Sequence, residues 1–347
     1  MNSPATSTPV YPHQAPPAAG ERLEVADGVY WLAMPLPFAL DHINLWLLED
    51  TAGWVIVDCG IATEDTRRLW ESILAECLDE GPIERIIVTH YHPDHLGLAV
   101  WLSERLGAEL FMSQGDYLTA HAVWEEVGGY GDAKVAGLFQ AHGLSGQRLD
   151  RIASRGNTYR RGVPELPNRY RRLHDNDIVT IKGRLWRVLM GYGHAPEHAA
   201  LYCDELHVLI AGDMMLPRIS TNVAVGPVEP EGDPLKRFLD SLERFRPLPQ
   251  DTLVLPSHGK PFRGLHARIE DLRKHHEARL AEIFEACATP RSAAELLPLL
   301  FRRELDTHQL FFAMGEAIAH LNHLTHRNLL ARERGGDGVY RFVKVRQ

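Results

Sequence analysis

The densest group of potential metal ligands in the chain lies within one short segment. His90, His92, Asp94 and His95 form the pattern His-x-His-x-Asp-His. Neutral imidazoles and a carboxylate suit zinc and, less selectively, iron or manganese. The segment follows the apolar run 85–89, which is typical of a buried strand, so its side chains would lie in a loop and could converge. Four polar residues in a solvated loop are the alternative, but this clustering of ligand types favours a metal site.

Three isolated residues could supply the ligands that one motif lacks for a second metal. Each directly follows an apolar run and lies in a turn rich in Gly or Pro: His194, Asp213 and His258. The end of a strand is a place from which a side chain can reach a shared site. Each residue alone would more simply be an ordinary turn residue. As a set at matching strand ends, the three predict a centre with two metals.

Short apolar runs separated by turn residues must position these ligands. Strands are expected at 23–32, 44–50, 54–58, 85–89, 109–112, 178–181, 185–190, 200–203, 206–210 and 253–255. Helical spacing is found at 64–78 and 96–106. Strands and helices that alternate twice over fit an α+β fold, with one sheet on another and helices outside, better than an all-parallel barrel.

A helical, arginine-rich insert is predicted over residues 113–175. Between Arg148 and Arg172 there are eight arginines but only two acidic residues, in a chain whose net charge is −9. Guanidinium groups suit phosphate or carboxylate, so the insert could bind an anionic substrate. A solvated helical face or a homodimer surface is an equally good interpretation.

The residues from 263 to 347 predict three helices followed by a two-stranded ribbon, which is the order of a winged-helix domain. The first helix is expected at 263–287, the second begins at a capping box at Ser292–Glu295, and the third is expected at 306–327. The strands are expected at 329–334 and 339–345. This region holds 14 Lys and Arg against 11 Asp and Glu. Since a nucleic-acid module should be more basic, a packing, lid or dimerisation role is favoured.

Composition narrows the class of protein further. An acidic chain of 347 residues gives no support to wholesale nucleic-acid binding. The four cysteines form no Cys-x-x-Cys pair, which favours reduced thiols in a cytoplasmic protein. Residues 1–20 are rich in Pro, Ala, Ser and Thr, without the Lys or Arg of a secretory signal, and predict a disordered tail. No run reaches the roughly 20 apolar residues of a membrane helix, so no membrane partner is expected.

The ligand motif and the three turns together resemble the metallo-β-lactamase superfamily. The resemblance is to its glyoxalase II-like hydrolases and to the endoribonuclease-type hydrolases related to β-lactamase-like protein 2. It covers roughly residues 23–262, and the tail is similar to the winged-helix extension of the second group. It implies an αββα sandwich at 21–262 with the metals at one rim, the helical insert at 113–175 and a winged-helix domain at 263–347.

The resemblance also assigns roles to individual residues. His90, His92 and His194 would bind the first metal, and the second would be held by Asp94, His95 and His258. Asp213 would bridge the two metals. Asp58, at the end of the expected strand 54–58, would orient a ligand imidazole. His198 could line the pocket or make a structural hydrogen bond.

These assignments predict a hydrolase with two zinc ions, although iron or manganese would fit the same ligands. A hydroxide between the metals would attack the substrate, with Asp94 and Asp213 as catalytic residues that would relay a proton to the leaving group. A non-catalytic scaffold is disfavoured because every ligand position is filled. β-Lactamase action is disfavoured because the chain has no export signal and continues well beyond a lactamase domain.

Two kinds of substrate remain open. The arginine-rich insert favours a thioester or ester of a small anionic carrier, such as an acyl-coenzyme A or acyl-glutathione, and Arg160, Arg161 and Arg218 could bind its charge. Arg218 follows Asp213 by five residues but could equally form a surface salt bridge. The alternative is a single-strand endoribonuclease, which the winged helix and the family resemblance suggest.

Overall fold

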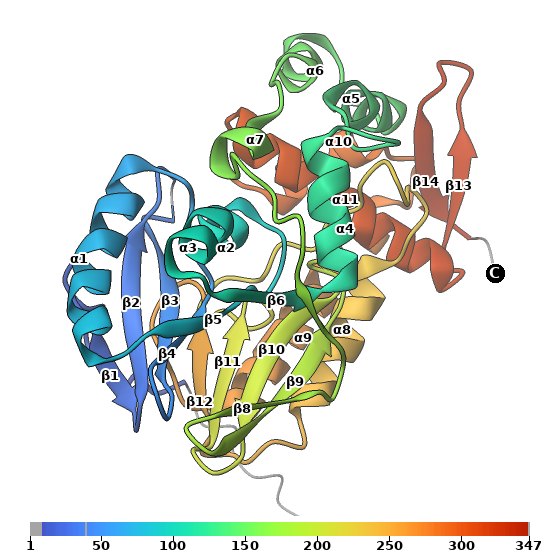
Figure 1. Ribbon diagram of the computed structural model, residues 1–347. Coiled ribbons are helices and arrows are strands. Elements are labelled where there is room, and N and C mark those ends of the chain that lie inside the picture. Colours follow the sequence, from blue (N-terminus) through green and yellow to red (C-terminus); the bar gives the residue numbers. More distant parts are fainter. Residues whose placement is uncertain (1–8, 39, 346–347) are drawn as a thin grey trace, which may run out of the picture. The chain divides into compact units, whose positions relative to one another are not determined.

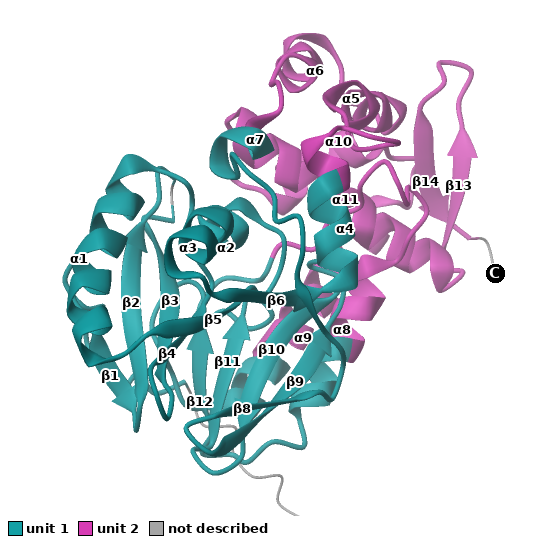
Figure 2. Ribbon diagram, in the orientation of Figure 1, with its two compact units in different colours: residues 1–121, 159–221, 241–270 teal, residues 122–158, 222–240, 271–347 magenta. Residues whose placement is uncertain are grey.

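The computed structural model describes residues 9–38 and 40–345 of the chain (Figure 1). The chain divides into two compact units (Figure 2). Unit 1 comprises residues 1–121, 159–221 and 241–270, and unit 2 comprises residues 122–158, 222–240 and 271–347. No helix among the described residues is long and apolar enough to cross a membrane.

Unit 1 contains a seven-stranded sheet whose strands follow one another in chain order. They are β1 (Leu23–Ala26), β2 (Val29–Pro35), β3 (His42–Glu49), β4 (Trp54–Val57), β5 (Ile83–Ile87), β6 (Glu109–Ser113) and β7 (Arg171–Leu173). The pairs from β1 to β4 are antiparallel and those from β4 to β7 are parallel. Helices α1 (Glu64–Glu80), α2 (Pro93–Leu96) and α3 (Ala99–Leu106) connect the parallel strands.

A second sheet in unit 1 has five strands in the order β12-β11-β10-β9-β8. They are β8 (Ile178–Ile181), β9 (Arg184–Gly191), β10 (His198–Cys203), β11 (Val208–Gly212) and β12 (Leu253–Pro256). All neighbouring pairs are antiparallel except β11 and β12, which are parallel. The two parallel strands end at the same edge of the sheet, so the turns after them lie together.

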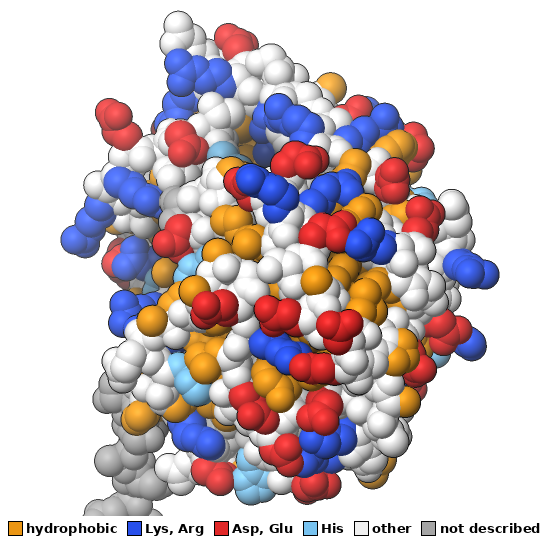
Figure 3. Space-filling model, turned by 60° about the vertical axis from the view of Figure 1, so that its left-hand side comes forward, with side chains coloured by type: hydrophobic (Ala, Val, Ile, Leu, Met, Phe, Trp, Pro, Cys, Tyr) orange, Lys and Arg blue, Asp and Glu red, His pale blue; other side chains and the backbone are white. Residues whose placement is uncertain are grey.

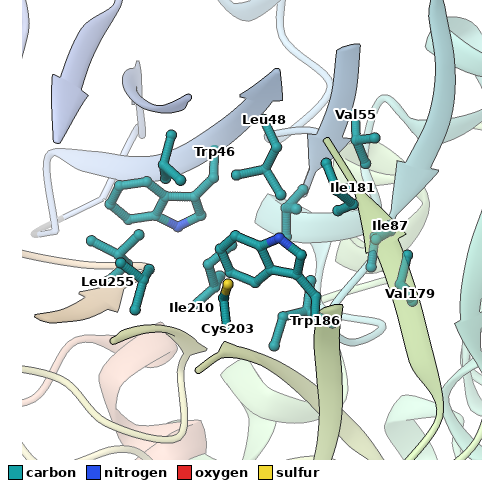
Figure 4. Packing of buried hydrophobic residues seen from close by; sticks show 14 of the residues in the cluster. Trp46, Leu48, Val55, Ile87, Val179, Ile181, Trp186, Cys203, Ile210 and Leu255 are labelled. Atoms are coloured by element: carbon teal, nitrogen blue, oxygen red, sulfur yellow. The ribbon is translucent and has the colours of Figure 1, made fainter. Parts of the chain in front are cut away.

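The two sheets pack face to face around one apolar core (Figure 4). Trp46 and Leu48 of the first sheet and Trp186 and Ile210 of the second belong to it, and each is nearly or fully buried. Burying a large apolar side chain contributes roughly 1.5–3 kcal/mol. Most residues of β3 and all of β10 are buried, which requires a covering layer on the outer face of each sheet as well.

Helices supply these outer layers. The buried side of α1 includes Trp70, Ile73 and Leu74, and it covers the first sheet (Figure 1). The buried Phe245 at the end of α8 (Pro234–Phe245) and Leu265 at the start of α9 (Leu265–Ala286) belong to unit 1. The αββα sandwich predicted from the sequence is therefore confirmed.

Unit 2 is mainly helical. It contains α5 (Asp132–Ala141), α6 (Gly146–Ala153), α10 (Ala293–Leu300) and α11 (Thr307–His326), followed by the antiparallel hairpin β13 (Leu330–Arg334) and β14 (Tyr340–Lys344). The predicted capping box at Ser292 and Glu295 opens α10, and an unpredicted one at Asp306 and Gln309 opens α11. Helices and ribbon follow in the predicted order, but their arrangement as a winged helix stays a prediction.

The structure corrects several predicted elements. The insert at 113–175 is helical in α4 (Gln114–Trp124), α5, α6 and α7 (Thr158–Gly162), but it ends in the strand β7. The run 23–32 is interrupted by a turn at Gly28, whose φ is 71°, and so forms two strands. The helix predicted at 96–106 is likewise interrupted, at Gly97 and Leu98. Helix α8 was not predicted.

The two compact units do not have the same limits as the domains predicted from the sequence. Residues 122–158 of the insert pack with residues 271–347 in unit 2, whereas residues 159–175 belong to unit 1. Residues 1–8 of the predicted disordered tail lie outside the described residues. Val10, further along, pairs with Arg263 through two backbone hydrogen bonds of 2.9 and 2.8 Å. The limits of the catalytic and C-terminal domains stay predictions.

Candidate metal centre

Seven potential ligands converge at the ends of four strands of unit 1. The turn after β5 carries His90, His92, Asp94 and His95, while His194, Asp213 and His258 follow β9, β11 and β12. Pro93 stands at the first position of α2, where its fixed φ suits a helix start, so Asp94 and His95 lie in a short helical turn. All the ligands predicted from the sequence are therefore brought to one place.

The seven side chains form two groups. His90, His92, His194 and Asp213 form the first, and Asp94, His95 and His258 the second, with the ligand atoms of each group within 4.8 Å of one another. In the first, Nε2 of His90 is 2.9 Å from Nδ1 of His92 and 3.3 Å from Nε2 of His194. In the second, Nε2 of His258 is 3.3 Å from Oδ2 of Asp94. Each group has the size of a site for one metal ion.

Asp213 faces both groups with different oxygens. Its Oδ2 lies 3.2 Å from Nε2 of His194 and 3.9 Å from Nε2 of His90. Its Oδ1 lies 3.6 Å from Nε2 of His258 and 3.8 Å from Nε2 of His95. A carboxylate with one oxygen toward each ligand group is the arrangement that a bridging ligand requires.

Two buried atoms at the centre have no hydrogen-bond partner among the described residues: Nε2 of His95 and Oδ1 of Asp213. Leaving a buried polar group unsatisfied costs about 1–3 kcal/mol. Both atoms are good ligands for a divalent cation, and both face the interior of the second group. The residues present therefore fit a metal ion there.

Electrostatics keep His90, His92 and Asp94 in the protonation states that metal binding requires, whereas His95 would have to lose a proton to the cation. Burial, together with neighbouring imidazoles, holds the pKa of His90 well below its usual range and lowers that of His92 to about 3, so both rings are neutral. Burial alone would raise the pKa of Asp94, but His95 and His258 lower it to about 2. Burial likewise opposes a charge on His95, but the Asp58, Asp94 and Asp213 carboxylates raise its pKa to about 10. A cation would compete with that proton for the same carboxylates.

Asp58, which was expected to orient a ligand imidazole, contacts that of His95. It is buried and has a φ of 63°, which places it in the left-handed region. Its Oδ2 lies 2.7 Å from Nδ1 of His95, and its Oδ1 accepts a hydrogen bond of 2.8 Å from the Thr89 amide. The His95 ring is thereby held with Nε2 directed toward the centre.

His198 makes a structural hydrogen bond, the second of its two proposed roles. Its Nε2 accepts the Asp213 N–H at 3.1 Å, and the ring is fully buried. The Thr221 hydroxyl also donates to the Asp213 carbonyl. The backbone of Asp213 is therefore fixed on both sides of its Cα.

Asn44 was not identified from the sequence, although it holds the turn that carries His258. Its Nδ2 donates to the carbonyls of Pro256 and Gly259, both at 2.7 Å, and its Oδ1 accepts from Nε1 of Trp31. Nδ1 of His258 in turn lies 3.1 Å from the His42 carbonyl. The available signal was one amide within the otherwise apolar run of β3.

The predicted substrate-binding arginines are all exposed. Arg160 and Arg161 lie on α7, and the guanidinium of Arg218 lies 5.6 Å from the ring centre of Tyr11. That distance allows a cation–π contact. Their role toward a substrate stays a prediction.

Comparisons with known proteins agree on one family. The model described as "Metallo-beta-lactamase superfamily" matches residues 39–258, and that of the "Metallo-beta-lactamase-like, C-terminal domain" matches residues 280–345. The crystal structure of a beta-lactamase domain protein from Burkholderia ambifaria is 51% identical, covers 96% of this chain and 98% of its own, and has a TM-score of 0.90.

Two curated proteins extend the comparison. The probable metallo-hydrolase YqjP of Bacillus subtilis is 25% identical over 90% of this chain and 97% of its own length. The hydroxyacylglutathione hydrolase of Ectopseudomonas mendocina is 24% identical over 71% of this chain and 73% of its own length.

Proposed function

Since this chain belongs to the metallo-β-lactamase superfamily and is a metal-dependent hydrolase, we propose that it cleaves a thioester or ester of a small anionic carrier at a centre of two divalent cations. The proposal of two cations rests on the position of Asp213, whose two oxygens face two separate groups of ligands. An acyl-coenzyme A or an acyl-glutathione is the kind of substrate we propose.

Each group would hold one cation. His90, His92 and His194 would bind the first, the second group would bind the other, and Asp213 would bind both. Nitrogen and oxygen ligands suit zinc and, less selectively, iron or manganese. When bound, such cations supply Lewis acidity and lower the pKa of water toward neutrality.

The two carboxylates of the centre, Asp213 and Asp94, would have different roles. Asp213 is the less exposed, with 10% of its side chain accessible, and its backbone is fixed by His198 and Thr221. Its role would be to hold and space the ligand groups. The Asp94 side chain is 20% exposed, and its Oδ2 lies 3.3 Å from His258. Asp94 is therefore the better placed of the two to pass a proton to a departing thiolate or alkoxide.

An acylated anionic carrier is supported by the surroundings of the ligand loop. The Tyr159 hydroxyl of α7 donates a hydrogen bond of 2.6 Å to the Tyr91 carbonyl, between His90 and His92. The helix that carries Arg160 and Arg161 is thus tied to the ligand loop, where guanidinium groups could bind a carboxylate or phosphate. The hydroxyacylglutathione hydrolase relative, by its name, acts on an acylated glutathione. On the face shown in Figure 3, Lys and Arg lie among Asp and Glu, which offers RNA no continuous basic surface.

The proposal is tested by metal analysis of the purified protein together with a panel of acyl-coenzyme A, acyl-glutathione, lactone and single-stranded RNA substrates. We expect two metal ions per chain and hydrolysis of a thioester or ester. Asp213→Ala should lose metal and turnover together, because it removes a ligand from both groups. Activity on RNA alone would contradict the proposed substrate, and Asp213→Ala with full metal content and turnover would contradict the proposed centre.

A further inference from the structure

A buried carboxylate that is not a predicted ligand lies beneath the two loops of the first ligand group. Asp116, in the first turn of α4, is fully buried. Its Oδ1 accepts a hydrogen bond of 2.9 Å from the Tyr91 amide. Its Oδ2 accepts from the Glu197 amide at 2.8 Å and from the Ser113 hydroxyl at 3.0 Å. Three donors therefore satisfy one carboxylate that has no access to water.

The two amides belong to the loops that carry the imidazoles of the first group. Tyr91 lies between His90 and His92, and Glu197 follows His194 by three residues. These loops come from different sheets, after β5 and β9, and are distant in sequence. One carboxylate with an oxygen on each loop therefore fixes the separation of the three imidazoles.

The second group is held by other residues. Asp58 orients His95, and Asn44 and the His42 carbonyl hold the turn of His258. None of these contacts involves Asp116. The Thr89 hydroxyl, which donates to Asp58, lies 3.1 Å from Nδ1 of His90 and 3.2 Å from Nδ1 of His95, so this support is shared by the two groups. The backbone hydrogen bonds of Asp116 come from Tyr91 and Glu197 in the loops of the first group, so its loss should affect that group first.

Further contacts tighten the support of the first group. The Glu197 side chain accepts a hydrogen bond of 2.7 Å from the Gly115 amide, so the loop after β9 and the start of α4 bind each other reciprocally. A Cβ on Gly115 would lie 3.0 Å from the Glu197 carboxyl carbon, which shows how closely they approach. Carboxylates at the N-terminus of a helix are also favoured by its dipole. Both backbone groups of Tyr91 are hydrogen-bonded: its N–H donates to Asp116, and its carbonyl accepts from the Tyr159 hydroxyl.

We propose that Asp116 is a positioning residue that sets the spacing of His90, His92 and His194 and thereby the metal affinity of the first group, while the second group has further contacts of its own through Asp58 and Asn44. This inference rests on the proposed function, because it takes both groups to hold metal. Asp116 acts through the backbone of the ligand loops and touches no substrate.

Asp116→Asn is the direct test, since it keeps the shape of the side chain but replaces one accepting oxygen with an NH₂ group that cannot accept from an amide. Loss of such supporting contacts typically weakens metal binding 10–100-fold. At a chelator concentration that leaves the wild type with two zinc ions per chain, the variant should retain one. Asp177→Asn is the matched control, because Asp177 also accepts a backbone N–H, from His174 at 2.7 Å, but in a turn without ligands. It should retain two zinc ions.

A second variant guards against a folding defect. Tyr159→Phe removes the hydrogen bond to the Tyr91 carbonyl, the other backbone group of the same residue, and changes no charge. It should weaken the same zinc ion several-fold, with the circular dichroism of the protein unchanged. Unaltered zinc affinity in both Asp116→Asn and Tyr159→Phe would overturn the proposal.

Double variants identify which zinc ion is weakened. Asp116→Asn with His95→Ala should bind none under the same chelator, because each change disables a different group. Asp116→Asn with His92→Ala should still bind one, because both changes disable the first group. One retained zinc in the former or none in the latter would overturn the proposal. A wild-type protein that takes up fewer than two would instead contradict the two-metal function, and the inference with it.

Discussion

At the scale of single residues, the placement of Asp213 depends on the glycine before it. Gly212 has a φ of 53°, in the left-handed region that side chains rarely adopt. A Cβ there would lie 2.3 Å from Nε2 of His198, the atom that accepts the Asp213 N–H. Gly212, His198 and Asp213 therefore form one structural feature: the glycine leaves room for the ring, and the ring fixes the Asp213 amide.

We therefore expect Gly212→Ala to remove metal as well as stability. The left-handed conformation costs a non-glycine residue roughly 1–2 kcal/mol, and the collision with His198 adds to this by displacing Asp213. Metal content and turnover should fall at least tenfold, and denaturant unfolding should show the loss of stability. Gly107→Ala is the control, because its φ of 67° imposes the same strain while nothing lies within 4 Å of its Cβ. Equal metal content in the two variants would contradict this account.

The ligands could be predicted from the sequence, but their supports could not. His90 and Asp213 are recognisable because their residue types and their positions after apolar runs are visible along the chain. Asp116 and Asn44 act on backbone amides and carbonyls of distant loops, and any residue can supply those partners. Such contacts become visible only once the sheets have brought the loops together.

At the scale of elements, the strands were predictable wherever burial on both faces gives a continuous apolar run, as in β3 and β10. Strand β7 gives no such signal, because it has three residues and two of them, Arg171 and Arg172, are exposed. Helix α8 did carry a signal: Leu235, Phe238, Leu242 and Phe245 have helical spacing and are buried. The predicted helix divides at Leu98, whose φ of −102° and ψ of 13° are not helical. The preceding Gly97 is closely packed, since a Cβ there would lie 2.5–2.6 Å from backbone oxygens of Pro93, Gly60 and Gly162.

His142, at the end of α5 in unit 2, should make the unfolding free energy depend on pH under acidic conditions. His142, the residue after α5, is 1% exposed and is stacked on Phe342 of β14 at 6.0 Å. Neither ring nitrogen has a hydrogen-bond partner among the described residues. Burial, and to a lesser degree the charge of Arg332, lowers the pKa of His142 from 6.5 to about 4. The unfolded chain therefore binds a proton below pH 6.5 that the folded chain refuses until about pH 4, so stability falls as the pH falls through this window.

His142→Leu should remove this part of the acid sensitivity. Between pH 7 and pH 5 the wild type should lose about 2 kcal/mol more unfolding free energy than the variant, at about 1.4 kcal/mol for each pH unit below 6.5. Denaturant unfolding at the two pH values measures the difference. His174→Leu, at an imidazole whose side chain is 55% exposed, serves as the comparison. Identical pH dependence in the wild type and His142→Leu would show that burial does not suppress the protonation of His142.

At the scale of the whole molecule, the candidate metal ligands are confined to one of the two units. All seven candidate ligands belong to unit 1, and they come from loops spread over residues 90–258. The match to the C-terminal domain of the family, at residues 280–345, lies within unit 2, which contributes none of the seven. A metal bound at the candidate centre should therefore stabilise unit 1 directly, by joining the ends of β5, β9, β11 and β12.

Removal of metal should consequently loosen one unit selectively. A ligand that binds only the folded state adds about 4 kcal/mol when its free concentration is 1,000 times its Kd, and a chelator withdraws this contribution. Asp94 and Asp213 would then remain buried without their cations, so amides of β11 and β12 should exchange hydrogen faster, while those of α10 and α11 in unit 2 keep their protection. Hydrogen exchange followed by mass spectrometry, with and without chelator, measures this. In Asp213→Ala the chelator should change nothing, since the metal is already lost. An equal loss of protection in α10 and α11 would mean that the two units unfold as one cooperative body, and an unchanged β11 would mean that metal does not stabilise the centre.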